Sequence, residues 1–358
     1  MRKILLLLTI LVILPFFTLK ISADDSVDEY ISDFEDALPD GFRDMSDGEK
    51  LIDMASPESL LSYVIGGISG EKSRILSFLL TLLGSATLIS VASLSHGSLS
   101  EQVQTGVGVI CSLLIFSAIR PLIATVTDGI TTLGKFFASL IPITVGITAL
   151  GGGSATASVQ AVGMYTALSS VGGLGGEIFI SLSAFGLSMS LLSAFGNEGA
   201  GSVTRGFRSL FGWVTGIFTA LLTAAFSLQT IVASSVDRGA MRAIKYAASG
   251  LIPVVGSTVS GAISTLASGL SYAKGIIGGG AILVMLYMAI SPLAVLLIYR
   301  LALTLAGIFA DFAASSVASR IFSSYRFALD MTVTVYSLSA LIYLFEIVIF
   351  ILIGVAAS

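Results

Sequence analysis

The sequence predicts an all-α fold: a polytopic transmembrane helical protein with a short acidic extracytoplasmic segment near its N-terminus. The first observation is composition, because 55% of the 358 residues are hydrophobic and only 11% are charged, against about 25% in an average soluble domain. The second is a mean hydropathy of +0.98, which comes from repeated apolar runs long enough to cross a bilayer. The third is that acidic residues concentrate between positions 24 and 58, ahead of those runs. We therefore divide the chain into a signal peptide (1–23), an acidic exported helical neck (24–74) and a multi-span transmembrane domain with broken or re-entrant helices (75–358).

The first 23 residues have the three parts of a secretory signal peptide. Arg2 and Lys3 supply positive charge, residues 4–19 form an apolar core, and Ile21-Ser22-Ala23 is an acceptable cleavage site. The apolar run is long for a cleaved peptide, so a retained signal anchor is the alternative.

The neck has the opposite character. Thirteen acidic residues lie between positions 24 and 58, against only two basic ones. Apolar residues recur at helical spacing and predict an amphipathic helix over 25–38, and a second helix begins after Ser56, which is suited to cap it. The acidic run is either the solvated face of an exported segment or a docking surface for a partner's basic patch.

Apolar runs of membrane-crossing character begin after Arg74 and continue to the C-terminus. We expect spans at 75–94, 106–119, 136–150, 161–174, 178–195, 209–236, 275–310 and 331–356. The 275–310 run is too long for one straight crossing, and Gly278-Gly279-Gly280 and Pro292 interrupt it. We therefore expect a kinked or broken helix, or a tight hairpin, in that run.

Basic residues orient the chain only in part. Positive-inside counting places three clusters in the cytoplasm. These are Arg205 with Arg208, Arg238 with Arg242 and Lys245, and Arg320 with Arg326. A single crossing by the 209–236 span cannot leave the first two clusters on the same side. Either that span is a hairpin, or the 238–245 helix lies outside or in the membrane interface.

A stripe of small polar residues follows the second basic cluster. Arg238, Arg242 and Lys245 share one helical face; after a break at Pro253 and Gly256, serines recur at spacings of three and four residues. The stripe consists of Ser257, Ser260, Gly261, Ser264, Ser268 and Ser271. This face either packs closely against another helix, because small residues let backbones approach, or lines a water-filled path.

One carboxylate stands inside the last apolar run. Glu346 lies within Tyr343-Leu344-Phe345-Glu346-Ile347-Val348, where an ionised group costs about 2.5–3.5 kcal/mol on insertion scales. We expect it to face protein or water, with Arg300 as its first candidate partner and Lys135 as its second. It serves an ion or proton path, or it forms a structural ion pair, or it lies near the membrane interface because the span is tilted.

Little in the chain indicates an enzyme. His96 is the only histidine and Cys111 the only cysteine, which removes most metal and acid–base chemistries. None of the glycine clusters is followed by Lys-Ser or Lys-Thr, as a phosphate loop requires. Gly67-Ile68-Ser69-Gly70 is only superficially similar to the serine motif of intramembrane proteases, because charged residues follow at once. We expect no catalytic residue, cofactor, metal or nucleic-acid partner.

The region around the serine stripe resembles the core signature of the stage III sporulation protein AE family. The residues that carry the resemblance are Arg242-Ala243-Ile244-Lys245-Tyr246, then Leu251-Ile252-Pro253-Val254-Val255-Gly256, then the serine-rich helix. Trp213-Val214-Thr215-Gly216 upstream and Ser291-Pro292-Leu293 downstream are similar in order and spacing. The likeness is detailed in the C-terminal half and is one of general layout in the first half.

This resemblance implies a non-enzymatic subunit of the channel or secretion complex that links mother cell and forespore in an endospore former. It implies a location in the mother-cell membrane around the forespore. The implied partners are the other stage III A sporulation proteins, including a cytoplasmic ATPase, and indirectly the forespore's stage II protein Q; a homo-oligomer is a further option.

The helices by themselves leave two other functions open. One is a stand-alone secondary transporter, whose site would lie at broken helices around Pro253 and Pro292. The other is a membrane scaffold that recruits partners.

Overall fold

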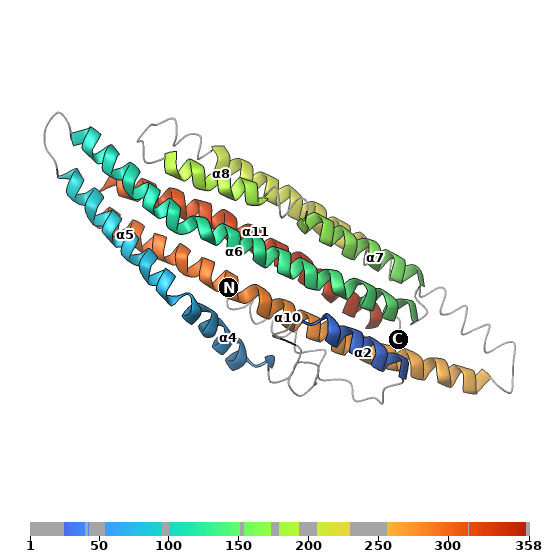
Figure 1. Ribbon diagram of the computed structural model, residues 1–358. Helices are drawn as coiled ribbons and strands as arrows, with labels where there is room; N and C mark the ends of the chain where they lie inside the picture. Colours follow the sequence, from blue (N-terminus) through green and yellow to red (C-terminus); the bar gives the residue numbers. More distant parts are fainter. Residues whose placement is uncertain are drawn as a thin grey trace.

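The computed structural model describes residues 25–39, 42, 54–94, 100–150, 154–172, 179–192, 206–229, 256–313 and 315–355. Within these ranges every regular element is a helix, and the helices form one elongated bundle (Figure 1). The labelled helices are α2 (Asp25–Ala37), α4 (Pro57–Gly70), α5 (Lys72–Ser93), α6 (Ser100–Leu150), α7 (Ser154–Ser169), α8 (Phe179–Leu192), α10 (Gly256–Phe312) and α11 (Ser316–Val355). A further helix, Gly206–Gln229, is drawn in yellow without a label.

Five of the described helices are long and apolar enough to cross a membrane. They are Lys72–Ser93, Gln102–Leu150, Gly206–Gln229, Tyr272–Phe312 and Ser316–Leu352. Their outer faces carry many exposed apolar side chains, such as Leu80, Val91 and Leu305, which is the surface that lipid requires. The predicted class, an all-α polytopic membrane protein, is therefore confirmed.

The two longest helices correct the predicted spans. α6 runs without interruption from Ser100 to Leu150, where we expected separate spans at 106–119 and 136–150. Pro121 and Pro142 lie inside it. Arg120, Asp128 and Lys135, which lie between the two expected spans, are exposed on the outer face of this continuous helix. Proline is tolerated in such helices because neighbouring groups satisfy the carbonyl that it frees.

α10 is likewise continuous from Gly256 to Phe312 and passes through Pro292, so the predicted break or hairpin in 275–310 is wrong. The glycine run serves packing instead of a turn: a Cβ on Gly278 would overlap Ile351 of α11 and lie 3.5 Å from Phe350. With 57 residues, α10 is about 85 Å long, nearly three times the ~30 Å hydrocarbon core, so part of it extends beyond that core.

The described part of the neck folds as its periodicity predicts. α2 buries Phe34 and Leu38, while Glu29, Asp33 and Asp36 are exposed. α2 packs on α6 and α10. Ser56 caps α4, since the Ser59 N–H donates to its Oγ at 3.2 Å. The signal peptide region, residues 1–23, lies outside the described residues.

The centre of the bundle is the antiparallel pair α10 and α11, with α6 running alongside α11 (Figure 1). Tyrosines of α11 contact glycines of α6: a Cβ on Gly129 would lie 2.9 Å from the Tyr336 ring, and one on Gly134 would lie 3.1 Å from the Tyr343 hydroxyl. The Tyr325 hydroxyl donates to the Ser112 carbonyl at 2.8 Å. These contacts hold α6 and α11 in one register, which positions the site described below.

Candidate functional site

An open groove of about 1240 Å³ lies between the Gly206–Gln229 helix and the α10–α11 pair. We call it the threonine groove. Its walls are Arg208, Phe211, Gly212, Thr215, Gly216, Thr219, Ala220, Thr223, Ala224, Ser227, Arg300, Thr304, Arg326, Phe327, Asp330, Met331 and Thr334. The lining is unusual for a membrane-spanning helix, because it combines hydroxyls, small residues and four charged groups.

One wall is a stripe of hydroxyls on the Gly206–Gln229 helix. Thr215, Thr219, Thr223 and Ser227 recur every four residues and therefore lie on one side of that helix. Three of the hydroxyls donate to the carbonyl four residues earlier: Thr219 and Thr223 at 2.8 Å, and Ser227 at 2.7 Å. Their protons are used within the helix, so their oxygens remain available to the groove as acceptors.

Thr215 differs from the others. Its Oγ1 is buried, and it has no hydrogen-bond partner in the part of the chain that the structure describes. Thr215 is among the residues that line the groove, about 10 Å along the helix from Arg208 at 1.5 Å per residue. A buried hydroxyl without a partner is costly. Because its oxygen is not accessible, Thr215 does not offer this hydroxyl to the groove in the conformation described.

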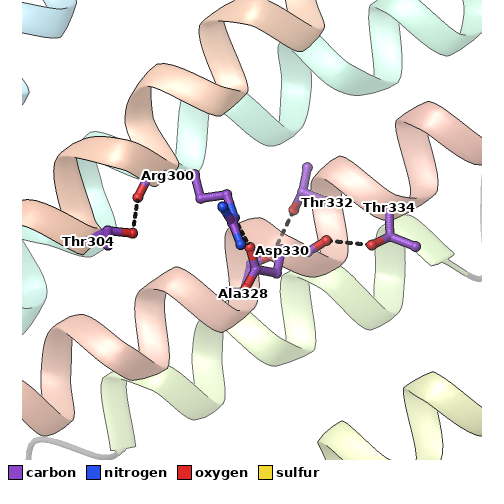
Figure 2. Close-up of polar contacts among 6 residues, drawn as sticks. All are labelled: Arg300, Thr304, Ala328, Asp330, Thr332 and Thr334. Carbon is purple, nitrogen blue, oxygen red and sulfur yellow. Dashed lines mark hydrogen bonds and ion pairs between the residues drawn. The ribbon is translucent and has the colours of Figure 1, made fainter. Parts of the chain in front are cut away.

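The opposite wall carries the charges. Figure 2 shows Arg300 of α10 reaching across to Asp330 of α11, to which its Nε donates. The same view shows Thr304 donating to the Arg300 carbonyl at 2.9 Å and Thr334 to the Asp330 carbonyl at 2.7 Å. The Arg300 and Asp330 side chains are 46% and 37% exposed, so the pair opens to the groove and adds little stability by itself.

Two further arginines lie at this end of the groove. The Arg208 guanidinium stands over the Phe327 ring, 4.4 Å from its centroid. Arg326 is half-buried, and no hydrogen bond or ion pair engages it among the described residues. Among the described lining residues, three guanidinium groups thus face one carboxylate, and their charge at this end of the groove is positive on balance.

The pairing of Arg300 corrects a prediction, since we expected it to neutralise Glu346. α10 and α11 are antiparallel, and their packing places Arg300 opposite Asp330. Glu346 lies about 24 Å further along α11 at 1.5 Å per residue. Lys135, the second candidate, is exposed and lines a different cavity of about 780 Å³ with Tyr343.

Glu346 is fully buried and is bound by an amide instead. Gln229 Nε2 donates to its Oε2 at 3.2 Å, while Oε1 has no partner within the described ranges. Gly163 of α7 makes room for this contact, because a Cβ there would overlap the Gln229 amide. Glu346 therefore marks the place where α7, α11 and the end of the Gly206–Gln229 helix meet.

The serine stripe is only partly described. Residues 256–271 are helical and form the start of α10, as the spacing predicts. The side chains of Ser257, Ser260, Ser264, Ser268 and Ser271 lie outside what the structure describes, so packing and pore lining both stay predictions. Arg238, Arg242, Lys245 and Pro253 also lie outside the described residues; Gly256 is the first residue of α10.

The sequence reasoning missed the threonine groove. The four-residue spacing from Thr215 to Ser227 is the same kind of signal as the serine stripe, whereas the sequence prediction for residues 209–236 is only a plain span or a hairpin. The structure has a single helix there, Gly206–Gln229, so the hairpin is wrong. Arg208 and Arg326 were counted only as orientation signals, because their approach to Arg300 depends on helix packing.

Among the described residues, no three His, Cys, Asp or Glu side chains are grouped closely enough to hold a metal ion. A family model described as stage III sporulation protein AE matches residues 38–356 of the chain. No curated protein and no solved structure matches it.

Proposed function

Because the chain belongs to the stage III sporulation protein AE family, we propose that it is a non-enzymatic membrane subunit of the channel or secretion complex between mother cell and forespore. Membership gives the chain a role in sporulation, and the multi-span bundle makes it a multi-pass membrane protein. The channel function is the inference added here.

The threonine groove is the observation that carries this proposal. From Arg208 to Ser227 it follows the helix for about 28 Å at 1.5 Å per residue, close to the ~30 Å hydrocarbon core. The charged groups along this strip are costly against lipid tails, which favours water or a neighbouring subunit facing them. Because the groove is open on one side, it forms only part of the wall of a channel. A second subunit would supply the rest of that wall.

The remaining parts of the proposal concern location and partners. We place the protein in the mother-cell membrane around the forespore, with the acidic neck outside the cytoplasm. The exposed carboxylates Glu29, Asp33 and Asp36 on α2 suit a docking surface there. The proposed partners are the other stage III A proteins, including a cytoplasmic ATPase, and indirectly the forespore's stage II protein Q.

A stand-alone secondary transporter has less support than it had from the sequence. Its expected site needed broken helices around Pro253 and Pro292. α10 is continuous through Pro292, and Pro253 lies outside the described residues.

Cysteine accessibility in sporulating cells tests the proposal. On a Cys111→Ser background, Thr219→Cys and Thr223→Cys should react with a small soluble thiol reagent, because a thiolate forms where water reaches. Leu221→Cys is the matched control: Leu221 is 66% exposed on the same helix but does not line the groove, and should stay unreacted in lipid. Unreactive Thr219→Cys and Thr223→Cys in assembled complexes, with no co-purified ATPase, would argue against a channel subunit.

A further inference from the structure

We infer that the charged end of the threonine groove is a binding site for a phosphate group. The inference concerns this end alone and does not depend on the groove forming part of a channel. Arg208, Arg300 and Arg326 come from three different helices and line one groove. We call them the arginine cluster.

The contacts place the cluster within about one helical turn. Arg208 stacks on Phe327, which follows Arg326 in the chain, and Arg300 pairs with Asp330, one turn further on. One turn of helix rises about 5.4 Å. The three guanidinium groups are therefore near enough to act on a single ligand.

The charge balance selects an anion. Among the residues that the structure describes, Asp330 is the only carboxylate that lines the groove, and it pairs with Arg300. Arg326 makes no hydrogen bond or ion pair in the described part of the chain, and Arg208 makes only its ring contact. An excess of about two positive charges matches the charge of a phosphate, and the planar fork of arginine binds phosphate oxygens in pairs.

Uncharged residues line the groove as well as the arginines. Thr215 is one of them, about 10 Å along its helix from Arg208 at 1.5 Å per residue. Phe211 and Met331 also line the groove and supply apolar surface next to the cluster.

Two sources offer this chemistry: the headgroup of an anionic phospholipid and a phosphate-bearing solute. Basic pockets between membrane helices bind lipid headgroups, and an apolar slot beside the cluster suits an acyl chain. The two sources separate experimentally, because only the lipid carries its phosphate on an acyl chain.

The lipid arm uses Trp213, the only tryptophan of the chain, which lies on the groove helix and is 72% exposed. Full-length protein is placed in nanodiscs of phosphatidylcholine containing 20% brominated phosphatidylglycerol, or the same fraction of brominated phosphatidylcholine. We expect stronger quenching of Trp213 by the anionic lipid. An Arg208→Gln/Arg326→Gln double variant should lose that preference, and Arg320→Gln, an exposed arginine of α11 outside the groove, should keep it.

The solute arm titrates inorganic phosphate into nanodiscs of phosphatidylcholine alone, at constant ionic strength set with chloride. The melting temperature should rise with phosphate in the wild type, and the apparent affinity should fall roughly tenfold or more in the double variant. Asp330→Asn should bind several-fold more tightly, because it removes a negative charge that pairs with Arg300. Thr215→Val should bind as the wild type does, because the Thr215 hydroxyl is buried away from the cluster.

A preference for brominated phosphatidylglycerol alone identifies a lipid phosphate, and a response to inorganic phosphate alone identifies a soluble ligand; either result supports the site. The proposal is overturned if a monodisperse double variant behaves as the wild type in both arms, or if the wild type responds in neither. Asp330→Asn also serves as a control for misfolding, because loss of structure can weaken phosphate binding but cannot strengthen it.

Discussion

At the scale of single residues, Glu346 shows how a buried carboxylate is held without a cation. It is 0% exposed and accepts one hydrogen bond, from Gln229 Nε2 at 3.2 Å. Replacing it by leucine leaves the Gln229 amide buried without its acceptor. Such a loss costs about 1–3 kcal/mol, more than removing both partners together.

We therefore predict that Glu346→Leu lowers the free energy of unfolding by about 1–3 kcal/mol. The Glu346→Leu/Gln229→Leu double variant should lose less than the sum of the losses of the two single variants. Glu346→Gln keeps the shape and a hydrogen bond, so its loss should be smaller. Glu346→Lys should be the most destabilising, because it places an ammonium among apolar groups. Unfolding by detergent titration, followed by Trp213 fluorescence, measures each value.

The control for this prediction is Glu71→Leu, which removes an exposed ion pair with Arg74 at 3.1 Å. Exposed pairs contribute about 0–1 kcal/mol, so that variant should stay close to the wild type. Strictly additive effects of Glu346→Leu and Gln229→Leu would mean that the hydrogen bond is energetically irrelevant.

At the scale of helices, α6 and α11 pack together through glycines of α6 that contact tyrosine side chains of α11. Gly134 lies against the Tyr343 hydroxyl and Leu168, and the Tyr343 ring stacks on Phe137 with centroids 4.5 Å apart. Gly134→Leu should force the two helices apart and cost about 1–3 kcal/mol by overpacking. Gly106→Leu, on the same helix but with nothing within 4 Å of an added Cβ, should be neutral or stabilising. Equal melting temperatures for the two variants would rule out this contact as a determinant of packing.

The serine stripe at the start of α10 yields a second prediction at this scale. If it lines water, cysteines at Ser257, Ser260 and Ser264 should react with a soluble thiol reagent and a cysteine at Ile263 should not. If it packs against another helix, all of them should stay unreacted and Ser264→Leu should prevent assembly. Reaction at every position, Ile263 included, would contradict both interpretations.

At the scale of the whole molecule, the direction in which each helix crosses the membrane decides which helix termini lie on the same side. α2 and the end of α11 lie at the same end of the bundle (Figure 1). The Gly206–Gln229 helix is a single element, so the chain enters and leaves it at opposite ends. The sequence left two alternatives: a hairpin at 209–236, or a 238–245 helix outside the cytoplasm or in the membrane interface. With the hairpin excluded, the second alternative remains as the prediction.

We predict that the acidic neck is outside the cytoplasm, because its many carboxylates cannot be buried unpaired. On a Cys111→Ser background, Ser46→Cys should be labelled by an impermeant reagent in intact cells. Ser323→Cys, exposed near the opposite end of the bundle, should be labelled only after permeabilisation. The reverse pattern would invert the orientation.

The features that the sequence alone determined are local ones. Apolar composition predicted the membrane class, periodicity predicted α2, and Ser56 predicted the cap of α4, because each depends only on neighbouring residues. Tertiary structure decided the continuity of α6 and α10 through their prolines, the partner of Arg300 and the gathering of the arginine cluster. These depend on which helix faces pack and in what register, and the contacts that settle register join residues far apart in the chain. The hydroxyl stripe of the threonine groove lies between the two cases: its spacing can be read from the sequence, but its meeting with three arginines follows only from the packing of its helix against α10 and α11.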